Sequence, residues 1–234
     1  MNNKKLVDIS KQFNSDKQSA HGYLDIYEHF FKKIQNQKIN ILEIGVLGGD
    51  SLLIWDKYFS DVTIYGLDVF ERVSMDNVSK KCEGKSNIKL HKVNSHRKNE
   101  VDNFFKNNKD LKFDIIIDDG WHNPWGQIQT FHNFKDSLHK DGLYIVEDVW
   151  QLDRIVEYPD DLKELELKNL TFSTDKMNVK DYFEYNIPSF KWIKTKERTD
   201  RVIDGANFGY CYNEDNLNNW DESHKNVLKN HFSM

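Results

Sequence analysis

The chain has 234 residues, enough for one sizeable core, and its 33 basic and 38 acidic side chains give a net charge of −5 with no Lys/Arg block that would indicate a nucleic-acid surface. Its two cysteines, Cys82 and Cys211, lie far apart without a CxxC pair, which argues against a disulfide framework or a thiolate zinc site. No stretch is apolar enough for a membrane span or a signal peptide, so we expect a cytoplasmic protein without membrane or nucleic-acid partners.

The first part of the chain alternates between predicted helices and strands. Apolar residues at helical spacing predict a helix over residues 22–35, and an apolar run predicts a strand from Ile39 to Ile44. The elements that follow are a helix over 51–59, strands over 62–67 and 88–93, a helix over 100–107, a strand over 113–117, a helix over 127–139 and a strand over 142–146. This alternation predicts an α/β fold with a doubly wound, mainly parallel, Rossmann-like sheet.

The pattern weakens after Trp150. We interpret residues 151–189 as an irregular cap, either a variable lid or an interface, and residues 190–195 and 207–212 as two late strands that form an antiparallel hairpin at the sheet edge. The simplest organisation is a single domain, 1–234. Its parts are an N-terminal helical cap (1–36), a cofactor-binding core (37–150), the variable segment (151–189), and late edge strands with a C-terminal helix (190–234).

Two predicted strands end in acidic residues. Asp118 and Asp119 follow the strand over 113–117, and Glu147 and Asp148 follow the strand over 142–146, one crossover later. Buried carboxylates are costly unless a cation or hydrogen-bond donors satisfy them, and oxygen ligands suit a hard divalent cation such as Mg²⁺. One acidic pair alone is more often a helix cap or a turn, but two acidic strand ends followed by His122 favour a functional site.

The earlier strands predict a cofactor site. Asp68 ends the second strand, where a carboxylate can accept hydrogen bonds from a ribose diol, so an adenosine cofactor is expected. The turn after Glu43 contains Gly45, but Leu47 stands at the second glycine of a dinucleotide fingerprint and would obstruct a pyrophosphate. NAD and FAD are therefore disfavoured, and S-adenosylmethionine is favoured. The glycines alone are equally typical of an ordinary strand-to-helix turn.

Together these motifs resemble the class I S-adenosylmethionine-dependent methyltransferases. The resemblance runs from Ile41 to Trp150 and is carried by Glu43-x-Gly45, Asp68, Asp118-Asp119-Gly120-x-His122 and Gly142-Leu143-Tyr144-x-x-Glu147-Asp148. More narrowly, the chain is similar to the metal-dependent sugar O-methyltransferases of macrolide and related glycosides, which also match Ser15-Asp16-Lys17, His21-x-Tyr23 and Tyr27-Glu28. It departs from the family pattern at the missing middle glycine and at Val93-Asn94-Ser95, where relatives often carry Gly-Asp.

The resemblance implies roles for individual residues. Asp119, Glu147 and Asp148 would be the metal ligands, and His122 would be the general base, acting with Asp119 in catalysis. The cofactor-binding residues would be Glu43, Gly45, Ser51, Asp68, Asn94, Asp118 and Tyr23. The N-terminal Lys17 and His21 would contact the methionine carboxylate or the acceptor. An imidazole titrates near neutrality and can accept a hydroxyl proton.

The favoured function is therefore metal-assisted O-methylation of a sugar, as a glycoside, a polysaccharide precursor or a nucleotide-activated sugar, by a homo-oligomer. Trp121, Trp125 and Trp150 flank the carboxylates, and at least one of them is expected to stack on the acceptor rather than to serve core packing alone. A nucleotide-sugar oxidoreductase and a non-catalytic cofactor-binding protein are the alternatives. Leu47 weighs against the first, and the set of carboxylates with His122 weighs against the second.

Overall fold

The structure is a computed structural model that describes residues 5–19 and 22–149, together with residues 180, 183, 191–194 and 207–212. Its strands form one sheet in the order β3-β2-β1-β4-β5-β7-β6. β1, β2, β3, β4 and β5 pair in parallel, as predicted. The strands are β1 (Lys38–Ile44), β2 (Asp61–Asp68), β3 (Ile88–Lys92), β4 (Phe113–Asp118), β5 (Leu138–Val149), β6 (Lys191–Lys194) and β7 (Asn207–Tyr212).

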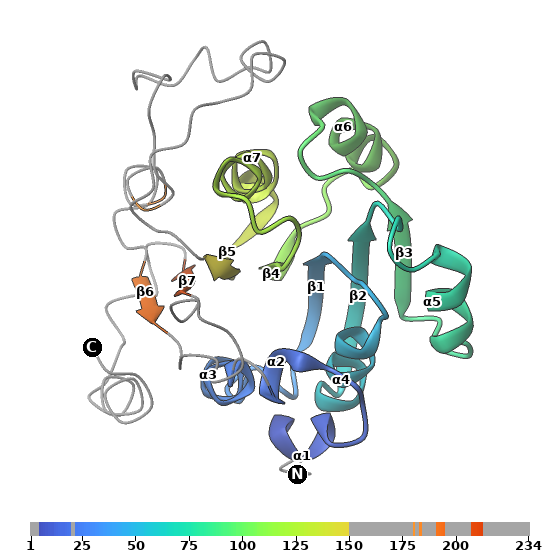
Figure 1. The fold of residues 1–234 in the computed structure, drawn as a ribbon, viewed down its shortest axis with the longest axis vertical. Helices are drawn as coiled ribbons and strands as arrows, with labels where there is room; N and C mark the ends of the chain where they lie inside the picture. The colour runs from blue at the N-terminus through green and yellow to red at the C-terminus, as the bar shows by residue number, and fades with distance from the viewer. Residues whose placement is uncertain are drawn as a thin grey trace.

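Helices cover both faces of this sheet. Figure 1 shows α6 and α7 on one side and α1, α3 and α4 on the other. The described helices are α1 (Leu6–Ser10), α2 (Asp16–Ser19), α3 (Tyr23–Phe31), α4 (Asp50–Tyr58), α5 (Met75–Lys81), α6 (Lys98–Asn107), α7 (Pro124–Phe134) and the short 3₁₀ helix η1 (Lys135–Ser137). None of the described helices is long and apolar enough to cross a membrane.

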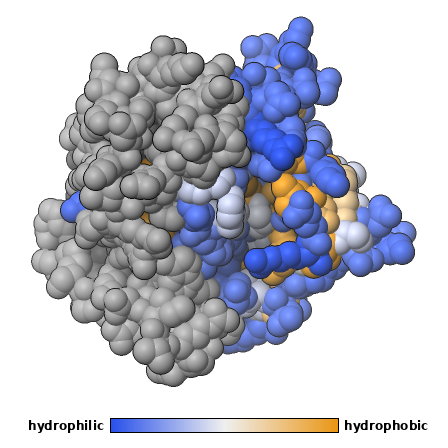
Figure 2. Space-filling view, turned by 45° about the horizontal axis from the view of Figure 1, so that its top comes forward, coloured by the Kyte–Doolittle hydropathy of each residue, from blue (hydrophilic) through white to orange (hydrophobic). Residues whose placement is uncertain are grey.

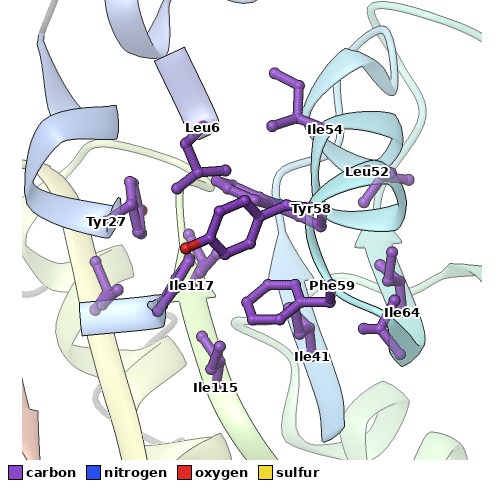
Figure 3. Packing of buried hydrophobic residues seen from close by; sticks show 14 of the residues in the cluster. Leu6, Tyr27, Ile41, Leu52, Ile54, Tyr58, Phe59, Ile64, Ile115 and Ile117 are labelled. Carbon is purple, nitrogen blue, oxygen red and sulfur yellow. The ribbon is translucent and has the colours of Figure 1, made fainter. Parts of the chain in front are cut away.

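The core consists of two hydrophobic layers, one on each face of the sheet. Along β1, Ile39 and Ile41 face the layer that contains α1, α3 and α4, while Leu42 and Ile44 face the layer that contains α6 and α7. Figure 3 shows the first layer, in which side chains from α1, α3 and α4 meet those of β1, β2 and β4. This alternation follows from the two-residue repeat of a strand, and it also decides where polar residues at the strand ends point.

Two boundaries and one helix illustrate where the structure differs from the prediction. α7 begins at Pro124 instead of Gln127, because the Asn123 side chain caps the helix by accepting from the Trp125 N–H and Pro124 occupies the first helical turn. β5 begins at Leu138, within the predicted helix over 127–139. α5 was not predicted, because Val78 is its only buried residue and the segment shows little apolar periodicity.

The late strands extend the sheet past β5. β7 pairs antiparallel with β5, and β6 pairs antiparallel with β7. The segment that joins β6 to β7 lies outside the described residues, so the predicted hairpin stays a prediction. The predicted lid or interface over 151–189, apart from residues 180 and 183, and the predicted C-terminal helix also lie outside them. Of the described residues there, Phe183 is buried in the layer of α6 and α7.

Candidate active site at the carboxyl ends of the parallel strands

Three strand-end carboxylates lie over one face of the sheet. Glu43 on β1 is level with Ile117 on β4, which is level with Ile145 on β5, and both isoleucines belong to the layer of α1, α3 and α4. Two residues further along these strands come Asp119 and Glu147. The two-residue repeat therefore directs Glu43, Asp119 and Glu147 toward the N-terminal helices.

The ammonium group of Lys17, on α2, lies among these carboxylates. Its Nζ is 2.7 Å from Asp119 Oδ2 and 2.7 Å from Glu147 Oε1. Glu43 Oε1 lies 3.6 Å away. Burial lowers the pKa of Lys17, but the attraction of the three carboxylates outweighs it and raises the pKa well above its usual value. Lys17 was expected to contact the methionine carboxylate or the acceptor, whereas here it pairs with the protein's own strand ends; His21 lies outside the described residues.

Glu43, predicted to bind the cofactor, is fully buried at the bottom of this cluster. Its Oε2 accepts a hydrogen bond of 2.8 Å from Trp55 Nε1. Burial raises the pKa of Glu43, although Lys17 and hydrogen bonds from Ser51 and Trp55 act in the opposite direction. Ser51, which was also predicted to bind the cofactor, lies buried in the first turn of α4. Glu43 and Ser51 thus contact each other inside the protein, and their contact with a cofactor stays a prediction.

Two buried tyrosines of α3 hold the carboxylates at the end of β5. The Tyr27 hydroxyl donates to Glu147 Oε1, the same oxygen that contacts Lys17. The Tyr23 hydroxyl donates to Asp148 Oδ1 at 2.5 Å and accepts from the Asp148 N–H at 3.3 Å. Burial and the neighbouring carboxylates raise the pKa of both tyrosines well above the usual value, so both hydroxyls stay protonated.

Asp148 has an unusual backbone conformation, with φ of 51°. A non-glycine residue rarely adopts a positive φ, and such strain is concentrated at functional sites. Along β5, Tyr144 and Val146 face the layer of α6 and α7, so a regular strand would direct Asp148 there as well. The turn at Asp148 instead brings its carboxylate to Tyr23 and His122.

His122 bridges two of the carboxylates. Its Nε2 lies 3.1 Å from Asp119 Oδ1, and its Nδ1 lies 3.4 Å from Asp148 Oδ2. One potential ligand atom from each of Asp119, His122 and Asp148 lies within 4.8 Å of the others, which is close enough for one metal ion to contact all three. Of the predicted metal ligands, the structure brings Asp119 and Asp148 into this group, whereas Glu147 Oε1 is engaged by Lys17 and Tyr27.

The charges of this group determine its protonation. Burial lowers the pKa of His122, but Asp119 and Asp148 outweigh it and raise the pKa to about 9. Burial raises the pKa of Asp119, but Lys17 and His122 outweigh it and lower the pKa to about 2. Burial and the charge of Asp119 raise the pKa of Glu147 well above its usual value, despite Lys17. Asp119 and Asp148 thus favour the protonated ring of His122.

The predicted cofactor turn touches the metal-ligand loop. Gly45 has φ of 90°, and a Cβ at this position would lie 2.0 Å from the carbonyl oxygen of Asp119, so only glycine fits. The Asp68 carboxylate organises the turn: its Oδ2 accepts from the N–H groups of Val46 (2.8 Å) and Leu47 (3.1 Å). Leu47 itself has φ of 48° and is 53% exposed. The structure therefore brings Gly45 and Asp68 together beside the carboxylates.

Of the other two predicted cofactor residues, Asp118 lies on the sheet face of α6 and α7, and Asn94 lies in the loop after β3. Asp118 contacts the N–H of Gly120 (3.3 Å) and the hydroxyl of Tyr144 (3.5 Å), and burial raises its pKa to about 7. Asn94 Oδ1 accepts from the His96 N–H at 3.0 Å, which shapes the loop after β3. The cofactor contacts of Asp118 and Asn94 stay a prediction.

An aromatic cluster supports the loop that carries His122. Trp121 packs edge-to-face on Trp125, with ring centroids 4.7 Å apart, and the His96 ring lies against both. Trp121 is 56% exposed, so part of its ring is available to a ligand. Figure 2 shows a hydrophobic patch bordered by hydrophilic residues on one face of the molecule, and tryptophan and histidine do not contribute to its colour because neither is hydrophobic on the scale used there. Trp150, the third predicted stacking residue, lies outside the described residues.

Sequence reasoning missed the partners that hold the carboxylates. No contact was predicted for the Tyr27 hydroxyl, and no role was given to His96. The strand repeat was the signal that could have placed Glu43, Asp119 and Glu147 on one face, and a buried cation would then be expected near them. Nothing in the sequence identifies Lys17 as that cation.

No protein-family model matches the chain. Among curated proteins, it is 27% identical over 139 residues to the 8-demethyl-8-(2-methoxy-alpha-L-rhamnosyl)-tetracenomycin-C 3'-O-methyltransferase of Streptomyces olivaceus, which covers 56% of this chain and 33% of the relative. It is 28% identical over 153 residues to the mycinamicin VI 2''-O-methyltransferase of Micromonospora griseorubida, with coverage of 62% and 36%. The match therefore spans about a third of the length of these relatives.

Solved structures of methyltransferases match the fold of this chain. The MycE methyltransferase from the mycinamycin biosynthetic pathway, in complex with Mg, SAH and mycinamycin VI, matches with a TM-score of 0.56 and 26% identity over 65% of this chain and 41% of its own. A structure from Klebsiella pneumoniae matches with a TM-score of 0.57 over 91% of this chain and 90% of its own, but at 11% identity it shows the fold alone. The fold is the Rossmann-like fold of the class I methyltransferases.

Proposed function

We propose that this chain, with its class I methyltransferase fold and its sequence similarity to sugar O-methyltransferases, transfers a methyl group from S-adenosylmethionine to a sugar hydroxyl with the help of a divalent cation. The observation that carries the proposal is the convergence of Asp119, His122 and Asp148 beside the turn organised by Asp68. A scaffold protein has no need of this constellation. Its parts match the three tasks of the reaction: cation binding, cofactor binding and proton removal.

The carboxylates of Asp119 and Asp148 fit a hard divalent cation. Asp119 and Asp148 each keep one oxygen on the side of His122, and oxygen ligands suit Mg²⁺. Such a cation supplies positive charge that lowers the pKa of a bound hydroxyl. As the family resemblance implies, Glu147 would complete the ligand set through the oxygen that is not bonded to Lys17 and Tyr27. A related solved structure contains Mg and SAH, which supports the proposal of a divalent cation and an S-adenosylmethionine cofactor for this chain.

The turn after β1 fits an adenosine cofactor. Asp68 lies at the end of the second strand beside Gly45, at the edge of the sheet where open α/β folds bind their ligands. S-adenosylmethionine supplies the methyl group: its carbon–sulfur bond breaks as the bond to the acceptor oxygen forms. The close approach of Gly45 to the Asp119 backbone keeps this turn next to Asp119, so the proposed cofactor and cation sites are neighbours.

His122 is the group that accepts the hydroxyl proton in this proposal. Asp119 and Asp148 hold a proton on its ring and raise its pKa to about 9, so His122 becomes a base only when another cation takes up their charge. In this proposal, His122 can remove a proton only when a cation is bound by Asp119 and Asp148. An exposed Trp121 next in sequence offers an apolar face for the sugar ring.

The acceptor class is proposed from the relatives, whose names specify a rhamnosyl-tetracenomycin and mycinamicin VI. We propose a sugar hydroxyl on a small glycoside, with polysaccharide precursors and nucleotide-activated sugars as further candidates. A homo-oligomeric, cytoplasmic enzyme remains our expectation.

The test is methyl transfer itself. The protein is incubated with Mg²⁺, a panel of glycosides and S-adenosylmethionine carrying a deuterated methyl group, and mass spectrometry detects the gain of one labelled methyl. Asp119→Asn should abolish the gain. Asp114→Asn on β4, whose carboxylate accepts from the Asn40 N–H, should retain it. Absence of S-adenosylmethionine binding in calorimetry, together with no labelled product, would refute the proposal.

A further inference from the structure

Each of the two carboxylates beside His122 is held through one of its oxygens by a residue of the N-terminal helices. Asp119 contacts Lys17 through Oδ2 and His122 through Oδ1. Asp148 contacts Tyr23 through Oδ1 and His122 through Oδ2. In both carboxylates, a helix residue binds one oxygen, and this contact leaves the other oxygen pointing toward His122.

Unlike Lys17, Tyr23 also contacts the backbone of the carboxylate residue that it binds. Besides donating to Oδ1, its hydroxyl accepts from the Asp148 N–H, so it fixes both the side chain and the backbone of a residue with a positive φ. Tyr23 is fully buried on α3, so its ring position is set by packing in the core. An interaction that fixes the orientation of a metal ligand from outside raises the affinity of the site for its ion.

We propose that Tyr23 is a positioning residue of the divalent-cation site, which orients Asp148 so that Oδ2 converges with Asp119 and His122. This inference rests on the proposed function, and it gives Tyr23 a role different from the cofactor contact that the family resemblance implies. Its hydroxyl is already used on Asp148, on the side of the carboxylate away from His122. The expected consequence of its loss is a weaker cation site with an unchanged cofactor site.

The decisive variant is Tyr23→Phe, because it removes one neutral hydroxyl and keeps the ring in the core. Lys17→Met would change a charge as well as a contact, so its effect on cation binding has two opposing causes. The matched control is Tyr58→Phe: Tyr58 is equally buried, and its hydroxyl donates to Glu28, away from the carboxylate group. Circular dichroism and thermal unfolding establish that each variant is folded.

Mn²⁺ serves as the probe, because its electron paramagnetic resonance signal reports free and bound ion without any turnover. In protein stripped with chelator, Tyr23→Phe should bind Mn²⁺ about 10- to 100-fold more weakly than wild type, the usual effect of losing a partner of a metal ligand. Tyr58→Phe should bind like wild type. Calorimetry should give all three proteins the same affinity for S-adenosylmethionine.

The possible failures are distinguishable. If wild-type protein does not bind Mn²⁺, the metal site of the proposed function fails first, and this inference fails with it. If wild type binds but Tyr23→Phe binds equally well, only the positioning role is overturned. If Tyr23→Phe instead loses affinity for S-adenosylmethionine and keeps that for Mn²⁺, Tyr23 is a cofactor residue and the inference is wrong.

Discussion

Protonation of His96 should destabilise the loop that carries His122. The His96 ring is 9% exposed and packs against Trp121 and Trp125. Its Nε2 is buried without a hydrogen-bond partner among the described residues and lies 3.0 Å from the position of a Cβ on Gly126. A charge on this ring would be neither solvated nor paired, which is why burial lowers the pKa of His96 to about 4.

The magnitude follows from linkage between protonation and folding. The usual pKa of 6.5 applies to the unfolded chain, whereas the folded value is about 4. The unfolded chain therefore takes up the proton first as the pH falls, and stability is lost from about pH 6.5 until it levels off below pH 4. A shift of this size corresponds to about 3 kcal/mol in total, of which about 2 kcal/mol should be lost between pH 7 and pH 4.5.

The assay is urea unfolding of wild type and His96→Leu at both pH values. All other titrating groups are shared, so the pH-dependent loss of unfolding free energy should be about 2 kcal/mol smaller in the variant. The packing change in His96→Leu affects both pH values alike and cancels in this difference. A difference near zero would mean that the folded protein accommodates the charged ring, which would refute the reasoning from burial.

Three predictions concern the site directly. Asp68→Ala should weaken S-adenosylmethionine binding in calorimetry while Mn²⁺ binding persists, and unchanged affinity would leave Asp68 as a turn residue only. His122→Gln should lower kcat about 10²- to 10⁴-fold with S-adenosylmethionine affinity retained, and a variant with near-wild-type kcat would remove His122 from proton transfer. Asp148→Asn should weaken Mn²⁺ binding more than Glu147→Gln, because Glu147 Oε1 is bonded to Lys17 and Tyr27; equal losses would support Glu147 as a ligand of the same rank.

Much of the fold was predictable because its determinants are local. Short apolar runs predicted the five parallel strands, and the acidic residues at the ends of two of them are brought together around Lys17 and His122. The predicted helix over 127–139 left out Asn123 and Pro124, although Asn is a typical helix cap and Pro a typical first helical residue. α5 escaped prediction because a surface helix with one buried residue has almost no hydrophobic pattern.

The interior of the site was less predictable because its contacts are long-range. Tyr23 and Tyr27 have the spacing of a core-facing helix, and both are buried as that pattern requires. Their hydroxyl groups nevertheless reach carboxylates 125 and 120 residues away. A period in the sequence tells which face of a helix is buried, but not which polar atom lies opposite the end of a buried ring.

The separation of Lys17 from its partners has a consequence for biosynthesis. Lys17 precedes Asp119 by 102 residues and Glu147 by 130. At about 5–20 residues per second, a ribosome needs on the order of ten seconds to deliver the acidic strand ends after the lysine has been made. Until then α2 has no counter-ions to dock against, so the nascent N-terminal segment should stay sensitive to protease. Ribosome-bound chains stalled before residue 119 should be cleaved near Lys17, and chains released at full length should be protected there.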